Sequence, residues 1–170
     1  MKTLRILNER ETVIVTDTLN QLMLKELVDS EYSVTELSRK LNVPVLKLWR
    51  RMQKLLSAGM IELSSTIKVG NVEKKLYRAT AARFASAQLF EFKPKDPRLL
   101  EAFEIYSDLN KEVMASYLKF GEIPKDVDPI DFGLYATMLA FTEVLGRPGA
   151  MGRISELSSK LDEYGRGLSV

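Results

Sequence analysis

The sequence predicts a mostly α (α+β) protein. Apolar residues recur at helical spacing over much of the 170 residues, two predicted helices meet at a tight turn before Pro44, and two strand-like segments flank Gly70-Asn71. Helix, helix-turn-helix and then a hairpin is the order of a winged helix-turn-helix domain. We expect that domain over residues 1–80, with a C-terminal helical extension over 81–170.

The N-terminal residues are rich in aliphatic and β-branched side chains. Residues 3–7 and 11–15 read as strands, and Asn8-Glu9-Arg10 between them is a plausible turn. We expect either a hairpin or a single strand over 12–15. Asp17 is then positioned to cap a helix over roughly 18–29, because its carboxylate can accept from the first free backbone N–H groups.

The next two helices carry clear start and stop signals. Ser33 and Glu36 match the capping-box pattern, in which each side chain bonds the other residue's backbone N–H. Asn42-Val43-Pro44 is the predicted turn, because Pro is tolerated where a first-turn N–H has no helical partner. A helix is expected over 44–58, with Gly59 as its left-handed C-cap.

This third helix has a cationic side and an apolar side. The spacing i, i+3, i+4, i+7 aligns four cations, Lys47, Arg50, Arg51 and Lys54, while Leu48, Met52 and Leu55 occupy another side. Lys47 and Arg50 are the candidates for the DNA major groove, and Arg51 and Lys54 for phosphates. Trp49 either contacts DNA or, with more weight, packs against the preceding helix.

A basic hairpin follows. Met60-Ile61-Glu62-Leu63 predicts one strand and 75–79 the returning strand. The wing, residues 64–76, is expected to touch the DNA backbone or minor groove through Lys68, Asn71, Lys74 and Lys75. Arg39 and Lys40, late in the preceding helix, are further phosphate candidates.

The basic charge is concentrated in this region. Residues 39–78 hold 10 basic and 2 acidic residues, a net charge of +8, although the whole chain carries only +2. A local excess of this size indicates a surface for a polyanion. Double-stranded DNA is therefore the expected partner.

The residues over 37–61 carry a family resemblance. Leu37-Ser38-Arg39-Lys40-Leu41-Asn42-Val43-Pro44, then Arg50-Arg51-Met52-Gln53-Lys54-Leu55-Leu56-Ser57-Ala58-Gly59-Met60-Ile61, resemble the ArsR-type winged helix-turn-helix transcription regulators. The basic hairpin and Tyr77-Arg78 extend the resemblance, which covers roughly 17–80. It implies a dimeric repressor or activator that binds a partly palindromic operator.

The chain departs from that family at three points. Its first helix opens Asp17-Thr18-Leu19-Asn20 instead of Asp-Pro-Thr-Arg, and its recognition helix opens with apolar Pro44-Val45-Leu46 instead of small polar residues. The absence of Cys and His excludes the thiolate or imidazole metal sites of the metal-sensing members.

Beyond the wing, the sequence predicts mainly helices. Residues 81–87 read as strand or short helix, 89–92 as a short strand, 97–119 as a long helix, 130–145 as a deeply buried helix, and 151–164 as a last amphipathic helix, with a flexible connection over 146–152. These helices form a homodimer interface, enclose a small-molecule effector, or are plain core. The candidate dimer or effector residues are Leu100, Phe103, Tyr106, Val113, Tyr117, Tyr135 and Met138.

Composition argues against an enzyme. Without Cys or His there is no thiol or imidazole chemistry, and no phosphate-binding loop or metal-ligand spacing is evident, so we expect no cofactor and no metal. No apolar run suits a membrane span, and a cytoplasmic, nucleoid-associated location is expected. The leading function is a homodimeric DNA-binding transcription regulator. The alternatives are an architectural, chromatin-type DNA-binding protein and a winged-helix protein-interaction module.

Overall fold

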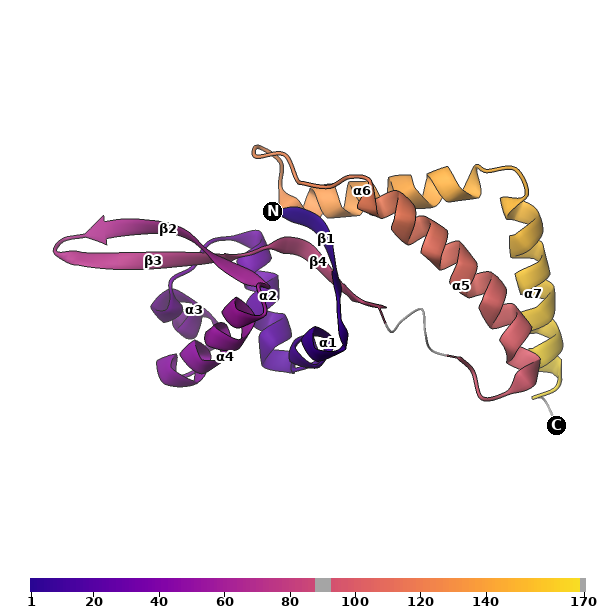
Figure 1. The fold of residues 1–170 in the computed structure, drawn as a ribbon, viewed down its shortest axis with the longest axis horizontal. Helices are drawn as coiled ribbons and strands as arrows, with labels where there is room; N and C mark the ends of the chain where they lie inside the picture. Colours follow the sequence, from indigo (N-terminus) through magenta and orange to yellow (C-terminus); the bar gives the residue numbers. More distant parts are fainter. Residues whose placement is uncertain (88–92, 169–170) are drawn as a thin grey trace. The chain divides into compact units, whose positions relative to one another are not determined.

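The computed structural model describes residues 1–87 and 93–168, which Figure 1 shows coloured along the chain. The chain divides into two compact units. The first consists of Met1–Ala87 together with Gly121–Gly133, and the second contains the remaining residues. The strand predicted over 89–92 lies outside the described residues.

The N-terminal prediction of a hairpin, or of a single strand over 12–15, is wrong. Strand β1 (Lys2–Leu7) is followed by a helix, α1 (Glu9–Val15), because Asn8 and Glu11 form a capping box that the strand-like composition concealed. The Glu11 N–H donates to Asn8 Oδ1 at 3.0 Å, and the Asn8 N–H donates to Glu11 Oε2 at 3.0 Å. Strand β1 instead pairs in parallel with β4 (Ala81–Ser86). The strand reading of residues 81–87 is therefore confirmed.

The three helices of the predicted helix-turn-helix region are confirmed. They are α2 (Thr18–Asp29), α3 (Val34–Leu41) and α4 (Val45–Ser57). Asp17 caps α2 by accepting from the N–H groups of Leu19 and Asn20. The capping box between Ser33 and Glu36 forms at the start of α3 as expected. Helix α4 ends before Gly59, whose φ of +63° is the left-handed conformation predicted there.

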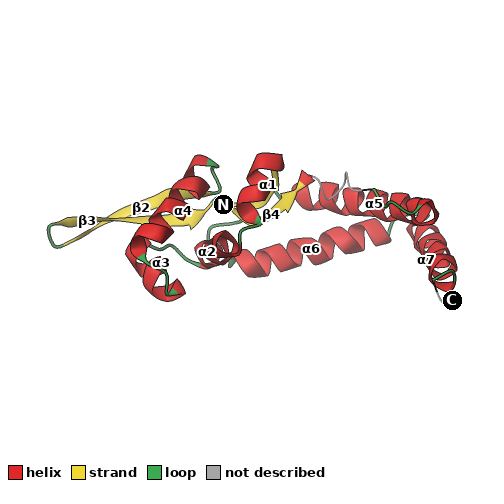
Figure 2. Ribbon diagram, turned by 90° about the horizontal axis from the view of Figure 1, so that it is seen from below, coloured by secondary structure: helices red, strands yellow, loops and turns green. Residues whose placement is uncertain are grey.

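The wing is a long antiparallel hairpin. Strands β2 (Ile61–Val69) and β3 (Val72–Ala79) pair along their length and turn at Gly70, where φ is +63°. Tyr32, between α2 and α3, exchanges two backbone hydrogen bonds with Tyr77 of β3. The hairpin projects beyond the helices α3 and α4 (Figures 1 and 2). The element order of a winged helix-turn-helix domain is thus present.

The core of the first unit lies between these helices and the base of the hairpin. Leu48, Met52 and Leu55 of α4 are fully buried, as are Leu27 of α2 and Leu37 of α3. Burying one such side chain contributes roughly 1.5–3 kcal/mol to folding. The apolar side of α4 is therefore fixed against the core, and its opposite side faces solvent.

The second unit is helical. It contains α5 (Pro97–Leu118), most of α6 (Pro129–Leu145) and α7 (Ala150–Arg166), and α5 packs along α7. Glu112 of α5 accepts from Arg147 and Arg153, and Lys119 pairs with Glu143 at 2.8 Å. The connection between α6 and α7 includes Gly149, where φ is +84°.

Helix α6 is not deeply buried, contrary to the sequence prediction. Only its small or branched side chains at one side, Ala136, Ala140 and Val144, are fully buried. Phe132 is half-buried, and the other large apolar side chains are exposed, namely Ile130, Leu134, Tyr135, Met138, Leu139, Phe141 and Leu145. The helix is apolar on most sides, but only the side that carries Ala136, Ala140 and Val144 is covered.

Among the described residues, no helix combines the length and the apolar character that crossing a bilayer requires.

Candidate functional site

The outer side of α4 carries three exposed cations. Lys47, Arg50 and Lys54 all face solvent, and no carboxylate in the described part of the chain forms an ion pair with them. Because Leu48, Met52 and Leu55 hold the other side of the helix in the core, these cations cannot turn inward. They form a fixed positive surface.

Arg51, the fourth predicted cation of this helix, has a different environment. Its guanidinium is half-buried and lies 2.8 Å from Asp17, the residue that caps α2. The pKa of Asp17 is lowered, mainly by the hydrogen bond from the Asn20 N–H and further by the charge of Arg51. Arg51 therefore ties α4 to the start of α2.

The two cations late in α3 also differ from each other. Arg39 is exposed and lines the groove described below. Lys40 lies 2.8 Å from Glu26 and donates to the Tyr32 hydroxyl at 2.6 Å. The hydrogen bond to Glu26 has the larger effect and the one to Tyr32 the next, and both raise the pKa of Lys40.

The predicted DNA contacts of the wing also differ from one another, because some are exposed and one is in an ion pair. Lys68, Asn71 and Lys75 are exposed around the hairpin turn. Lys74 instead forms an ion pair with Glu36 of α3, and this hydrogen bond, with those from Ser33, lowers the pKa of Glu36 to about 2. Lys74 is thus neutralised within the domain and connects the wing to α3.

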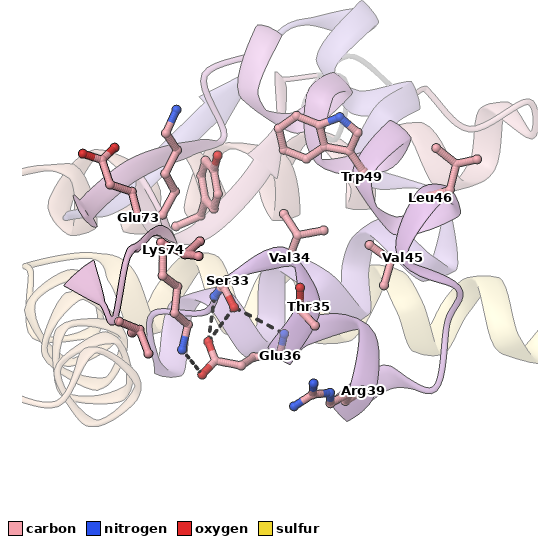
Figure 3. A pocket seen from close by; sticks show the side chains of 14 residues that line it. Ser33, Val34, Thr35, Glu36, Arg39, Val45, Leu46, Trp49, Glu73 and Lys74 are labelled. Atoms are coloured by element: carbon pink, nitrogen blue, oxygen red, sulfur yellow. Dashed lines mark hydrogen bonds and ion pairs between the residues drawn. The ribbon is translucent and has the colours of Figure 1, made fainter. Parts of the chain in front are cut away.

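A groove of about 980 Å³ lies between the wing and the first turns of α3 and α4. Half of its fourteen lining residues are aliphatic or aromatic, and the charged ones are Arg39, Lys74, Lys75, Glu36 and Glu73. In Figure 3, Val45, Leu46 and Trp49 of α4 line it together with Val34, and dashed lines join Glu36 to Lys74 and Ser33. The Trp49 ring is tilted against that of Tyr77, with the centroids 6.4 Å apart.

Sequence reasoning missed several residues of this groove. Val34, Val69 and Val72 line it, and Val69 and Val72 flank the hairpin turn where we expected only polar contacts. Two valines beside a Gly-Asn turn are a visible signal of an apolar wing tip. No sequence pattern could have predicted that Val34 lines the groove, because this depends on how the hairpin packs relative to α3.

The predicted dimer or effector residues are scattered through the second unit. Tyr117 is buried, Leu100, Phe103 and Val113 are half-buried, and Tyr106, Tyr135 and Met138 are exposed. Leu100 and Phe103 line a hollow of about 320 Å³ together with charged residues of α5. Among the described residues, no cluster of three or more acidic side chains is suited to hold a metal ion.

Comparisons with known proteins give one structural similarity to report. No family model and no curated protein matches this sequence. Among solved structures, the chain is similar to Bacillus subtilis PadR, seen in complex with operator DNA, at 19% identity and a TM-score of 0.36. The match covers 85% of this chain and 99% of that one. The winged helix-turn-helix assignment rests on the chain's own element order and packing.

Proposed function

We propose that this protein is a DNA-binding transcription regulator that acts as a homodimer. In this proposal α4 enters the major groove and the wing contacts phosphates or the minor groove. The observation that carries it is the set of exposed cations Lys47, Arg50 and Lys54, on a helix whose other side is fixed in the core. The resemblance of residues 17–80 to ArsR-type regulators agrees with it.

The cations take two roles in this proposal. Arg50 and Lys47 read bases, since both Arg and Lys can donate to the O6 and N7 acceptors of guanine. Lys54, Arg39 and the wing residues Lys68, Asn71 and Lys75 contact the backbone. Arg51, Lys40 and Lys74 already bond carboxylates, so they position α4, α3 and the wing, and reach a phosphate only by exchanging partners.

The homodimer is supported by the exposed apolar side of α6. Met138 is 61% exposed and Leu134 49% exposed on that helix, and clustered apolar exposure of this kind marks association surfaces. A dimer would present two α4 helices to successive major grooves, roughly 34–36 Å apart.

The decisive experiment measures DNA affinity against salt concentration. We expect log Kd to rise linearly with log salt, because each neutralised phosphate releases about 0.9 counterions. Arg50→Ala should cost about 1–3 kcal/mol on the preferred site and relax base preference. Lys25→Ala, which removes an exposed cation of α2, is the charge-matched control and should leave both unchanged. Salt-independent binding would overturn the proposal.

The apolar groove beside α4 favours a second candidate function, a protein-contact module. A footprint on genomic DNA separates the readings. One discrete protected site indicates a regulator, and protection of any sequence indicates an architectural protein. No protection and no mobility shift would indicate the protein-contact module.

A further inference from the structure

The first turn of α4 presents aliphatic side chains to solvent. Val45 is 48% exposed and Leu46 is 62% exposed. Neither contributes to the core, which takes Leu48, Met52 and Leu55 from the same helix. Exposed aliphatic groups contribute little to the stability of the fold. Because Val45 and Leu46 are adjacent on the surface, they are suited to contact a partner.

The surroundings of these two side chains define what that partner carries. Lys47, Arg50 and Arg39 lie around them without an ion-pair partner among the described residues. Figure 3 shows Val45 and Leu46 side by side at the start of α4, above Arg39. Two carboxylates, Glu36 and Glu73, line the same groove, but Glu36 is paired with Lys74 and the cations outnumber them. An aliphatic patch with a net positive surround matches an anionic surface that exposes small apolar groups.

The major groove of DNA has this chemistry. Its phosphates are anionic, and the C5-methyl of thymine is the apolar group that its base edges present. A purely apolar protein surface would leave the neighbouring cations desolvated and unpaired, which is costly. Charge complementarity therefore favours DNA as the occupant of this patch.

We infer that Val45 and Leu46 are specificity-determining residues that read thymine methyl groups. This inference rests on the proposed DNA-binding function and adds the class of sequence that is preferred, one with thymines facing the first turn of α4. The aliphatic side chains exclude water from the methyl group, while Arg50 and Lys47 retain the polar contacts.

The test uses synthetic duplexes that differ only in a methyl group. An alternating A·T duplex is compared with its uracil-substituted counterpart, and an alternating G·C duplex with its 5-methylcytosine counterpart. Affinity should fall about fourfold for each contacted methyl that is lost when uracil replaces thymine. The 5-methylcytosine duplex should bind more tightly than the unmethylated G·C duplex, because the methyl group of 5-methylcytosine also lies in the major groove.

A double variant, Val45→Ala with Leu46→Ala, assigns the effect to these residues. Both side chains are exposed, so the variant should fold, which circular dichroism checks. We expect it to bind thymine and uracil duplexes within about twofold of each other while keeping the salt dependence of wild type. The matched control is Val13→Ala with Leu22→Ala, two exposed aliphatic residues of α1 and α2, which should keep the full discrimination.

Each contrary outcome is distinct. If wild type binds thymine and uracil duplexes equally, the inference is wrong and DNA binding stands. If discrimination survives in the double variant, the methyl acts through DNA shape, and the assignment to Val45 and Leu46 is wrong. If no duplex is bound, both the inference and the proposed function fail. Loss of self-association in the double variant would then assign the patch to a second copy of the chain.

Discussion

A single ion pair changes the role expected for Lys74. Its position in a basic hairpin predicted a phosphate contact, but its ammonium group donates a hydrogen bond to the carboxylate of Glu36, 38 positions away. The same holds for Arg51 and Asp17. The charge of each side chain is known from the sequence, and helical spacing predicts which side chains are exposed. Ion pairs between distant residues depend on tertiary packing. The sequence therefore could not separate the cations that pair with carboxylates from those that do not.

Replacing Glu36 with Gln should remove a pH-dependent contribution to stability. The pKa of Glu36 is lowered from 4.5 to about 2, so the folded state favours the carboxylate. That stabilisation is fully present above pH 4.5 and is lost as the pH falls towards 2. The gap in unfolding free energy between wild type and Glu36→Gln should therefore shrink over this range, as denaturant titrations at several pH values measure.

Glu73→Gln is the control for this prediction. Glu73 lines the same groove and forms no ion pair among the described residues, so its loss should change the unfolding free energy less at neutral pH. A gap for Glu36→Gln that stays constant down to pH 2 would contradict the role of the carboxylate.

At the scale of elements, local signals predicted best. The capping residues Asp17 and Ser33 and the turn at Gly70 placed α2, α3 and the wing. Helix α1 was mispredicted because β-branched residues over 12–15 outweighed the capping box around Asn8. The parallel pairing of β1 with β4 was also missed, since strands that pair across the whole domain leave no local pattern.

Removing the α1 cap should destabilise the first unit. Asn8→Ala leaves the Glu11 N–H without its acceptor, and the loss of an N-cap typically costs about 1 kcal/mol. Denaturant unfolding should show this loss, and α1 amides should exchange faster with solvent. Asn8→Ser retains an acceptor oxygen and should remain within a few tenths of a kcal/mol of wild type. Equal stability of both variants would show that the cap contributes little.

At the scale of the whole molecule, the exposed side of α6 is the main departure from expectation. The apolar periodicity of residues 130–145 correctly predicts a helix. It shows which side chains favour burial, but it does not show which surface covers them. Whether the same chain or a second copy covers them is not encoded in the periodicity. The roles of the C-terminal helices therefore stay a prediction.

A charge on this side of α6 should break the proposed dimer. Met138→Lys places an ammonium group where the partner copy would bury it, and we expect at least about tenfold weaker self-association. Light scattering after size exclusion measures the mass directly. Val13→Lys, at a similarly exposed position of α1, should leave the mass unchanged. A Met138→Lys protein with the mass of wild type would exclude this part of α6 from the interface.

The first strand, β1, pairs along its length with β4, which is distant in the sequence. Thr3 donates backbone and side-chain hydrogen bonds to the Gly121 carbonyl, 118 positions away, and Lys2 donates to the Thr80 carbonyl. β1 precedes its partner strand β4 in the chain by more than 70 residues, so during synthesis it has no partner strand until β4 follows. Closing so long a loop is entropically costly, so β1 should dock late in folding, after α2, α3, α4 and the wing have already formed.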